Sequence, residues 1–206
     1  MINVTAEKLF DLAHPSAQRN IQPISEQVGP RLPASGMVVE IAAGSGYHSA
    51  ALADSYPNLT WQPTDRDIEA LGRITEMVEK AQLPNLQAPI ALDAGSPHWP
   101  IDHADAILCC NMIHIAPWSA AQGLFAGVGR ILNLDGALFL YGPFKVNGAH
   151  TAPSNASFDE SLRERDPSWG IRDTVEVDAL AYSAGLTLDT QIDMPANNML
   201  RIYKPA

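Results

Sequence analysis

The stretch V-V-E-I-A-A-G-S-G, residues 38–46, decides the fold of this chain. The apolar run over residues 37–42 is typical of a strand that is buried on both faces. This run stops at two glycines, and residues 47–56 then have a helical composition. A strand, a glycine turn and a helix in this order begin a nucleotide-binding unit, because glycine permits a sharp turn and lets a ligand lie close to the backbone.

Two kinds of cofactor are compatible with this turn, beside the alternative of an ordinary tight turn. A pyrophosphate dinucleotide such as NAD needs the pattern G-x-G-x-x-G/A with its phosphates at the helix N-terminus, and Ser49 stands at the third position. S-adenosylmethionine (SAM) has no phosphate and carries a sulfonium cation. For SAM, Gly44 and Gly46 with the carboxylate of Glu40 beneath them suffice. The turn therefore favours SAM over NAD.

The order of the remaining segments predicts an α/β fold with one seven-stranded sheet. Further strands are expected over residues 59–64, 86–92, 104–110, 136–141, 186–192 and 199–203, and helices over 68–81, 119–132 and 174–184. Residues 193–198 are too few for a parallel crossover, so the chain ends in an antiparallel hairpin on a mostly parallel sheet with helices on both faces. This ending resembles the Rossmann-like fold of class I methyltransferases more than dehydrogenase domains.

Length and composition limit the possible partners. The 206 residues predict a single domain, 1–206, with an N-terminal helical segment over 1–35 and a substrate-side insertion over 146–173. The net charge of −10 argues against nucleic-acid and membrane partners. The sequence shows neither a transmembrane-length apolar run nor a signal-peptide pattern, so a cytoplasmic location is expected. No Cys/His spacing typical of zinc occurs, so no metal is expected, and the oligomeric state stays open between monomer and homodimer.

Acidic residues at the ends of the second and third strands are candidates for holding a nucleoside. Asp65 lies 21 residues after Gly44, where nucleotide-binding folds place an acid for the ribose hydroxyls. The alternative is that Asp65 caps the next helix, although Asp67 is better placed to do so. Asp93 and the backbone of Ala94 are predicted to contact adenine, unless Asp93 only starts a turn.

The ends of the fourth and fifth strands are predicted to lie where methyl donor and acceptor meet, because ligands bind at the carboxyl ends of parallel strands. Asn111 is predicted to bond the methionine end of the cofactor. His114 and Tyr141 are catalytic candidates, His114 as a proton acceptor or as a residue that orients a hydroxyl. A lone histidine is more often structural. Tyr141 and Lys145 have the spacing of the short-chain dehydrogenase pair, but the glycine and proline between them exclude that helix.

Polar side chains in several segments are candidates for binding the acceptor. The N-terminal helix, which Ser16 is expected to cap and Pro23 to kink or restart, carries two of them, unless they belong to a solvated face. Residues 146–173 are dense in charge, as a salt-bridged surface helix would also be. Arginines there hint at an anionic acceptor such as a carboxylate, or they pair with acidic neighbours. The acceptor-side candidates are Arg19, Asn20, Trp118, Arg163, Arg165, Asn197 and Asn198.

Several motifs carry a family resemblance. E-I-A-A-G-S-G resembles the first motif of class I SAM-dependent methyltransferases, with Ala42 in place of the first glycine. The motifs R-N-x-x-P-I, N-M-I-H-I-x-P-W, F-D-x-S-L-R-x-R-D-P-x-W-G-I-R-D and M-P-A-N-N resemble the little-characterised family that includes methyltransferase-like protein 26, over roughly residues 16–204. That family usually has E-R-N at 18–20 and G-S-G-Q-H at 44–48, where this chain has Gln18 and Tyr47. The resemblance implies a class I methyltransferase fold, SAM binding, and Ala42 at the cofactor.

The sequence thus predicts a class I SAM-dependent methyltransferase that acts on a small-molecule acceptor, which the sequence does not identify. A general base is helpful for a hydroxyl acceptor and unnecessary for an amine or thiol, so this point stays open. The alternatives are an NAD-linked oxidoreductase and a SAM-binding protein without catalytic activity.

Overall fold

The computed structural model describes residues 9–206, so the first eight residues of the predicted N-terminal segment lie outside it. The described chain starts with a 3₁₀ turn, η1 (Phe10–Leu12), followed by α2 (Pro15–Val28) and the 3₁₀ turn η2 (Gly29–Arg31). The cap of α2 is His14 rather than Ser16, because His14 Nδ1 accepts from the Ser16 backbone N–H at 3.3 Å. Pro23 neither ends nor restarts this helix. The buried apolar side chains of α2 stabilise it despite the missing hydrogen bond.

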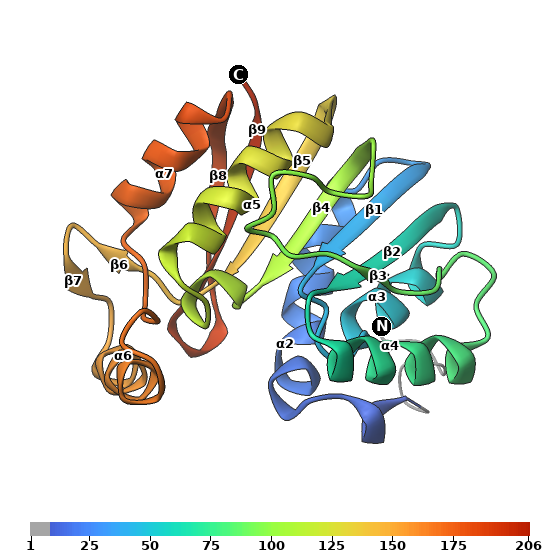
Figure 1. The fold of residues 1–206 in the computed structure, drawn as a ribbon, viewed down its shortest axis with the longest axis horizontal. Helices are drawn as coiled ribbons and strands as arrows, with labels where there is room; N and C mark the ends of the chain where they lie inside the picture. The colour runs from blue at the N-terminus through green and yellow to red at the C-terminus, as the bar shows by residue number, and fades with distance from the viewer. Residues whose placement is uncertain (1–8) are drawn as a thin grey trace.

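Seven strands form one sheet with the order β3-β2-β1-β4-β5-β9-β8 (Figure 1). The strands are β1 (Gly36–Ile41), β2 (Leu59–Asp65), β3 (Ile90–Ala91), β4 (Ala104–Cys110), β5 (Leu132–Gly142), β8 (Leu186–Met194) and β9 (Asn198–Pro205). Strand β9 is antiparallel to both of its neighbours, β5 and β8, and the other six strands are parallel. The predicted mostly parallel sheet with a C-terminal hairpin is confirmed.

Three predicted boundaries are wrong, each for a local reason. The third strand is only Ile90–Ala91 rather than 86–92, because Pro89 has no N–H to donate to the ladder and Leu86 makes an isolated bridge. Strand β5 starts at Leu132 rather than Gly136, directly after a helix. That helix, α5 (Trp118–Ile131), starts after Pro117 instead of being capped by Ser119.

Helices cover both faces of the sheet and bury two apolar clusters. The helices α2, α3 (Tyr47–Ser55) and α4 (Ile68–Ala81) contribute to one cluster, in which Trp61 and Phe139 are fully buried. The helices α5 and α7 (Thr174–Ser183) cover the opposite face, where Phe125 and Leu138 are fully buried. This arrangement leaves the carboxyl ends of the parallel strands, at the lower edge of the sheet in Figure 1, to be lined by loops.

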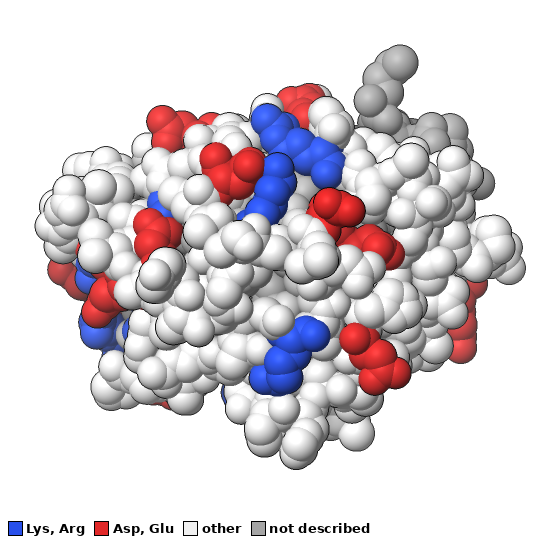
Figure 2. Space-filling view, turned by 90° about the horizontal axis from the view of Figure 1, so that it is seen from above, with Lys and Arg blue, Asp and Glu red and all other residues white. Residues whose placement is uncertain are grey.

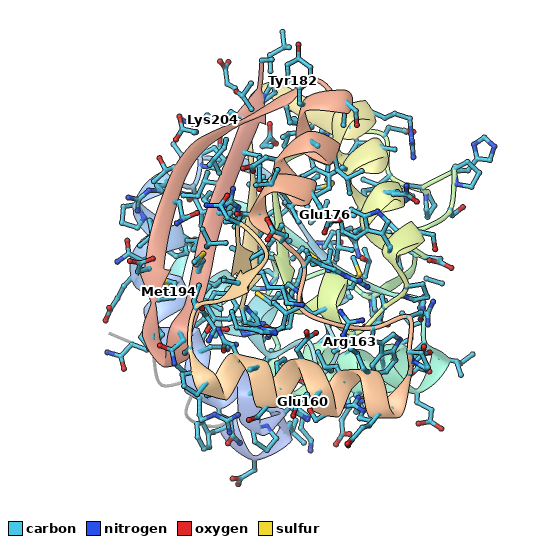
Figure 3. All side chains as sticks on the ribbon, turned by 90° about the vertical axis from the view of Figure 1, so that its left-hand side faces the viewer. Glu160, Arg163, Glu176, Tyr182, Met194 and Lys204 are labelled. Carbon is cyan, nitrogen blue, oxygen red and sulfur yellow. The ribbon has the colours of Figure 1, made fainter. Side chains whose placement is uncertain are left out.

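The charged segment predicted as an insertion forms a small substructure at that lower edge. It consists of the hairpin β6 (Lys145–Val146) and β7 (Ala149–His150), then α6 (Pro153–Arg165) and a loop to α7. Figure 3 shows α6 lying across the lower end of the molecule, below the turn between β8 and β9. The side chain of Asn155 donates to the carbonyl of Asn197 at 2.9 Å and so fixes α6 to that turn.

Charges are dispersed on the face of the molecule that Figure 2 shows. The face seen from above in Figure 2 carries acidic and basic groups side by side, without a continuous basic patch. Within residues 9–206, no helix is both long and apolar enough to cross a bilayer.

Candidate functional site

The glycine turn lies between β1 and α3, with two glycines in the left-handed region. Gly44 has a φ of +63° and Gly46 a φ of +76°. A Cβ at Gly44 would meet no atom of residues 9–206 within 4 Å, whereas one at Gly46 would lie 3.1 Å from Ile74 of α4. Ala42 also has a positive φ, +57°, where glycine is favoured. Gly46 is therefore required for packing, while the space beside Gly44 is open to a ligand.

The carboxylate of Asp65 is held against this turn. Its Oδ2 accepts from the Gly44 backbone N–H at 3.0 Å, and its Oδ1 accepts from the Asp67 backbone N–H at 3.0 Å. Asp65 is buried, and Asp67 caps α4 by accepting from Glu69 N–H. The cap alternative for Asp65 therefore does not apply to α4. Each oxygen of Asp65 still has a lone pair for a hydroxyl donor beside Gly44.

Both carboxylate oxygens of Glu40 have partners inside the protein. Its Oε2 accepts from the backbone N–H of Ser49 at 3.0 Å and from the Ser49 hydroxyl at 2.5 Å. Its Oε1 lies 3.1 Å from Nδ1 of His48. Glu40 is 1% exposed, so its charge lies below the first turn of α3 rather than in the open space. The anion-binding position at the start of α3 is thereby partly filled by the chain's own carboxylate.

A line of buried polar side chains continues from Glu40. Nε2 of His48 lies 2.7 Å from Oδ1 of Asn20 on α2, and a side-chain hydrogen bond joins Asn20 to Tyr141 at the end of β5. Burial raises the pKa of Tyr141 to about 12, while the hydrogen bond from Asn20 and the charge of Arg19 act in the opposite direction. The sequence predicted Asn20 and Tyr141 but not His48, because nothing local marks a histidine whose partners are distant in the chain.

The loop after β4 places Asn111 and His114 beside Tyr141. Asn111 has a φ of +61°, which asparagine tolerates, and its backbone N–H donates to the Tyr141 carbonyl at 2.8 Å. A Cβ at Gly142 would lie 2.6 Å from Nε2 of His114 and 3.3 Å from Oδ1 of Asn111. Glycine at position 142 therefore lets these two side chains lie close to the end of β5.

His114 is a neutral, buried ring. Burial and the positive charge of Arg172 lower the pKa of His114 to about 3. Its Nδ1 accepts from the Arg172 backbone N–H at 3.3 Å, which leaves the proton on Nε2. Nε2 is buried without a hydrogen-bond partner within residues 9–206. This environment favours hydrogen-bond donation by Nε2 over the proton acceptance that the sequence suggested.

Arg172 connects loop residues near His114 and Trp118, and the sequence analysis missed it. Its guanidinium donates to the carbonyls of Ile113 at 3.0 Å and Ala116 at 2.7 Å, and it stacks 5.4 Å from the ring centre of Trp118. The only sequence signal was its place within the motif W-G-I-R-D. Arg172 therefore fixes the segment that carries His114 and Trp118.

The arginines predicted on α6 are engaged with their neighbours. Arg163, which Figure 3 shows projecting from α6, forms an ion pair with Asp159 at 3.3 Å. Asp159 is buried and also accepts from Lys145 Nζ at 2.7 Å and from the Ile171 backbone N–H at 2.7 Å. Arg165 lies 4.9 Å above the ring centre of Trp169. Pairing with an acidic neighbour thus describes Arg163, whereas Arg165 contacts an aromatic ring instead.

The two asparagines of the β8–β9 turn lie on structural contacts. The side chain of Asn197 donates to the Ser154 hydroxyl at 3.1 Å, and that of Asn198 donates to the carbonyl of Pro195 at 3.0 Å. Asn197 therefore joins this turn to the first turn of α6. Trp118 contacts Arg172, and the preceding residue, Ile171, donates its backbone N–H to Asp159 of α6. Arg19 and Asn20 lie instead on α2, near Tyr141.

A hollow of about 550 Å³ opens where β2 and β3 end. It is lined by Arg66, Asp67, Ala91, Leu92 and Asp93. Asp93 is exposed, and its Oδ1 accepts from the Gly95 backbone N–H at 2.9 Å, as an aspartate that starts a turn does. Ala94, next to it, is buried. The backbone N–H of Leu92, which lines the hollow, donates to the Asp65 carbonyl at 2.9 Å, so the hollow lies next to the end of β2.

Solved structures of methyltransferases share this architecture. The chain is similar to the mitomycin 7-O-methyltransferase MmcR (TM-score 0.77, 17% identity, 92% of this chain and 55% of that one). It is similar to CalO1, a methyltransferase in calicheamicin biosynthesis solved in its SAH-bound form (TM-score 0.69, 14% identity, 98% and 68%). It is also similar to an O-methyltransferase family 2 protein from Planctomyces limnophilus in complex with apigenin (TM-score 0.72, 22% identity, 93% and 62%).

These similarities show that the chain has the Rossmann-like fold of class I methyltransferases. The chain spans little more than half of the length of MmcR. Its residues 11–205 match the family described as "Protein of unknown function (DUF938)", and the chain belongs to that family.

Proposed function

We propose that this protein is a SAM-dependent class I methyltransferase that acts on a small-molecule acceptor. The observation that carries the proposal is the carboxylate of Asp65, held 3.0 Å from the Gly44 N–H beside a space that no side chain of the described chain, 9–206, fills. A ribose placed there would donate its hydroxyls to Asp65 while the glycine backbone accommodates the rest of the cofactor.

The other cofactor residues follow from the order of the strands. Adenine would lie in the hollow at the ends of β2 and β3, near Asp93 and Ala94. The amino-acid tail would pass over residues 44–46 toward Asn111 at the end of β4. Glu40 would act indirectly, because its carboxylate is occupied by Ser49 and His48. Ala42 would contribute backbone to the turn.

The chain's main contribution to methyl transfer would be alignment. SAM supplies a methyl carbon that the sulfonium already activates, and good alignment with the acceptor is worth about 7–11 kcal/mol. The neutral Nε2–H of His114 would orient an acceptor oxygen by donating to it, with Trp118 as an apolar wall of the site. Tyr141, at the end of β5, would lie on the α2 side of the same position.

Two observations favour a small-molecule acceptor. The net charge of −10 is unsuited to a nucleic acid, and the similar structures are named for mitomycin, calicheamicin and apigenin chemistry. The resemblance of the tail motifs to the family that includes methyltransferase-like protein 26 extends this proposal to a specific subgroup and names no acceptor.

The alternative of an NAD-linked oxidoreductase is disfavoured by the start of α3. A pyrophosphate at this helix would meet the carboxylate of Glu40, which already accepts from the Ser49 N–H. Ser49 is fully buried and occupies the third position of the dinucleotide pattern. An enhancement of NADH fluorescence on mixing with the protein would support the oxidoreductase instead.

Methyl transfer itself can be tested without knowing the acceptor. The purified protein is incubated with tritiated-methyl SAM and the small-molecule fraction of a cell extract. We expect label in an extractable product with the wild type and with Asp102→Ala, an exposed aspartate away from the turn, and none with Asp65→Ala. If the wild type binds SAM but labels nothing in any fraction, the protein is a SAM-binding module rather than an enzyme.

A further inference from the structure

An unpaired cation lies beside the buried polar line on α2. Arg19 is exposed and makes no hydrogen bond or ion pair with any residue of the described chain, 9–206. Its charge nevertheless acts on Tyr141, which is 3% exposed. The other arginines predicted for ligand binding, on α6, already have partners in Asp159 and Trp169. Arg19 is therefore the cation among them that is left for an anion.

The contacts of the buried line set what remains for the Tyr141 hydroxyl. Nδ1 of His48 faces Oε1 of Glu40 at 3.1 Å and its Nε2 faces Oδ1 of Asn20 at 2.7 Å, so with His48 donating from both ring nitrogens the Asn20 amide nitrogen remains for Tyr141. An amide that donates to the phenol oxygen leaves the O–H proton of Tyr141 for another acceptor. His48 in turn is held by Glu40 at 3.1 Å. The line of Glu40, His48 and Asn20 thus presents Tyr141 as a hydrogen-bond donor beside Arg19.

The corner formed by Arg19, Asn20 and Tyr141 lies on the opposite side of the glycine turn from the proposed ribose position. Asp65 ends β2, whereas Tyr141 ends β5, next to the end of β4. The start of α2 approaches the turn, with His14 N–H 3.5 Å from the Ser45 hydroxyl, and His48 is the second residue of α3, which follows the turn. Neighbouring strands are about 4.8 Å apart. The tail of a ligand whose ribose lies at the end of β2 therefore crosses β1 and reaches the end of β4 after about 10 Å. The long side chain of Arg19 can cover the remaining step.

We propose that Arg19 and Tyr141 bind the carboxylate of the amino-acid tail of SAM, and that Asn20, His48 and Glu40 are positioning residues for this corner. The inference rests on the proposed function, because it assumes that the adenosyl group lies at Asp65. It moves Arg19 and Tyr141 from the acceptor side and the catalytic role, where the sequence placed them, to the cofactor. Recognition of the tail is what would distinguish SAM from nucleosides that lack an amino acid.

The test compares two ligands that share the adenosine and the sulfur but differ in the tail. S-adenosylhomocysteine (SAH) has the amino-acid tail, and 5′-methylthioadenosine lacks it. Calorimetry gives the ratio of their affinities for each variant. We expect Arg19→Ala to weaken SAH about 10-fold to 100-fold, the range for a charge-assisted hydrogen bond, and to leave 5′-methylthioadenosine within about twofold. Tyr141→Phe, which removes only the hydroxyl, should act in the same direction with a smaller effect.

The ratio of the affinities for SAH and 5′-methylthioadenosine also tests the positioning residues. Asn20→Ala should weaken SAH selectively, and Asn20→Asp should weaken it further, because a carboxylate would repel the carboxylate of the tail. Damage to the fold would weaken both ligands alike. Arg31→Ala is the matched control: it removes the same charge from η2, which follows the far end of α2, where Arg31 donates to the Gln27 carbonyl.

The outcomes separate this inference from the proposed function. If the wild type binds neither ligand, the proposed function fails. If the wild type binds both ligands and Arg19→Ala leaves the affinity ratio unchanged, this inference fails while the SAM site stands. Loss of methyl transfer in Arg19→Ala at unchanged SAH affinity would assign Arg19 to the acceptor and would likewise overturn the inference.

Discussion

At the scale of single residues, the glycine turn combines a packing position with a ligand position. Gly44 and Gly46 both need the left-handed region, but among residues 9–206 only Gly46 has a neighbour, Ile74, where a side chain would grow. Gly44→Ala should therefore cost about 1–2 kcal/mol of unfolding free energy for the backbone alone, and Gly46→Ala about 2–4 kcal/mol. Urea unfolding gives both values.

Gly44→Ala, which should cost less stability than Gly46→Ala, should have the larger effect on SAH affinity. Gly44→Ala places a methyl group in the open space and should abolish SAH binding in a protein that remains folded. SAH affinity that is unchanged in Gly44→Ala would mean that the cofactor does not lie over this glycine.

The buried ring of His114 predicts a pH dependence of stability. Its pKa is lowered from 6.5 to about 3. Between these two pH values the imidazole binds a proton in the unfolded chain but not in the folded protein. Stability is therefore highest above pH 6.5 and falls as the pH decreases. Between about pH 7.5 and about pH 5 the loss from this group should be about 2 kcal/mol.

Urea unfolding at the two pH values measures this loss. His114→Gln should remove most of the difference, whereas His103→Gln, at an exposed position, should keep it. An equal pH dependence in the wild type and His114→Gln would show that His114 is not buried as a neutral ring.

At the scale of elements, one buried carboxylate on α6, that of Asp159, joins this helix to β6 and to the loop before α7. Burial alone would raise the pKa of Asp159, but Lys145, the Ile171 N–H and Arg163 outweigh it and hold the pKa below its usual value. Asp159→Ala leaves the ammonium of Lys145 and a buried N–H without their acceptor, and should cost roughly 2–4 kcal/mol. Urea unfolding or thermal melting measures the loss.

The neighbouring Glu160 provides the matched control. It is exposed on α6 and labelled in Figure 3, and Glu160→Ala should change stability by less than about 0.5 kcal/mol. Similar losses in the two variants would show that α6 is held by something other than the contacts of Asp159.

The elements also show what the sequence could and could not predict. The strand, glycine turn and helix over residues 36–55 were predictable from a buried apolar run and two glycines, which act locally. The hairpin of β6 and β7 was not predicted, although Asn147-Gly148 between its strands is a strong hairpin signal. The short third strand depends on Pro89, whose effect on a ladder is visible once the partner strand is known.

At the scale of the whole molecule, the candidate site consists of residues that are distant in sequence. Asp65 was predicted from its spacing to Gly44, because a βαβ unit fixes that distance. His48 and Arg172 were not found, because their roles depend on partners 28 and 58 residues away. The carboxylate of Glu40 was placed at the cofactor by its proximity in sequence, and the fold turns it below α3 instead.

Titration of SAH into the purified protein by calorimetry tests the central claim, that an adenosyl group is held at Asp65 beside the glycine turn. The account predicts saturable binding to the wild type, weakened about 10-fold to 150-fold in Asp65→Ala and unchanged in Asp102→Ala, because Asp65 would lose a charge-assisted hydrogen bond worth about 1.5–3 kcal/mol. Absence of binding at millimolar SAH, or equal affinity of the wild type and Asp65→Ala, would contradict it.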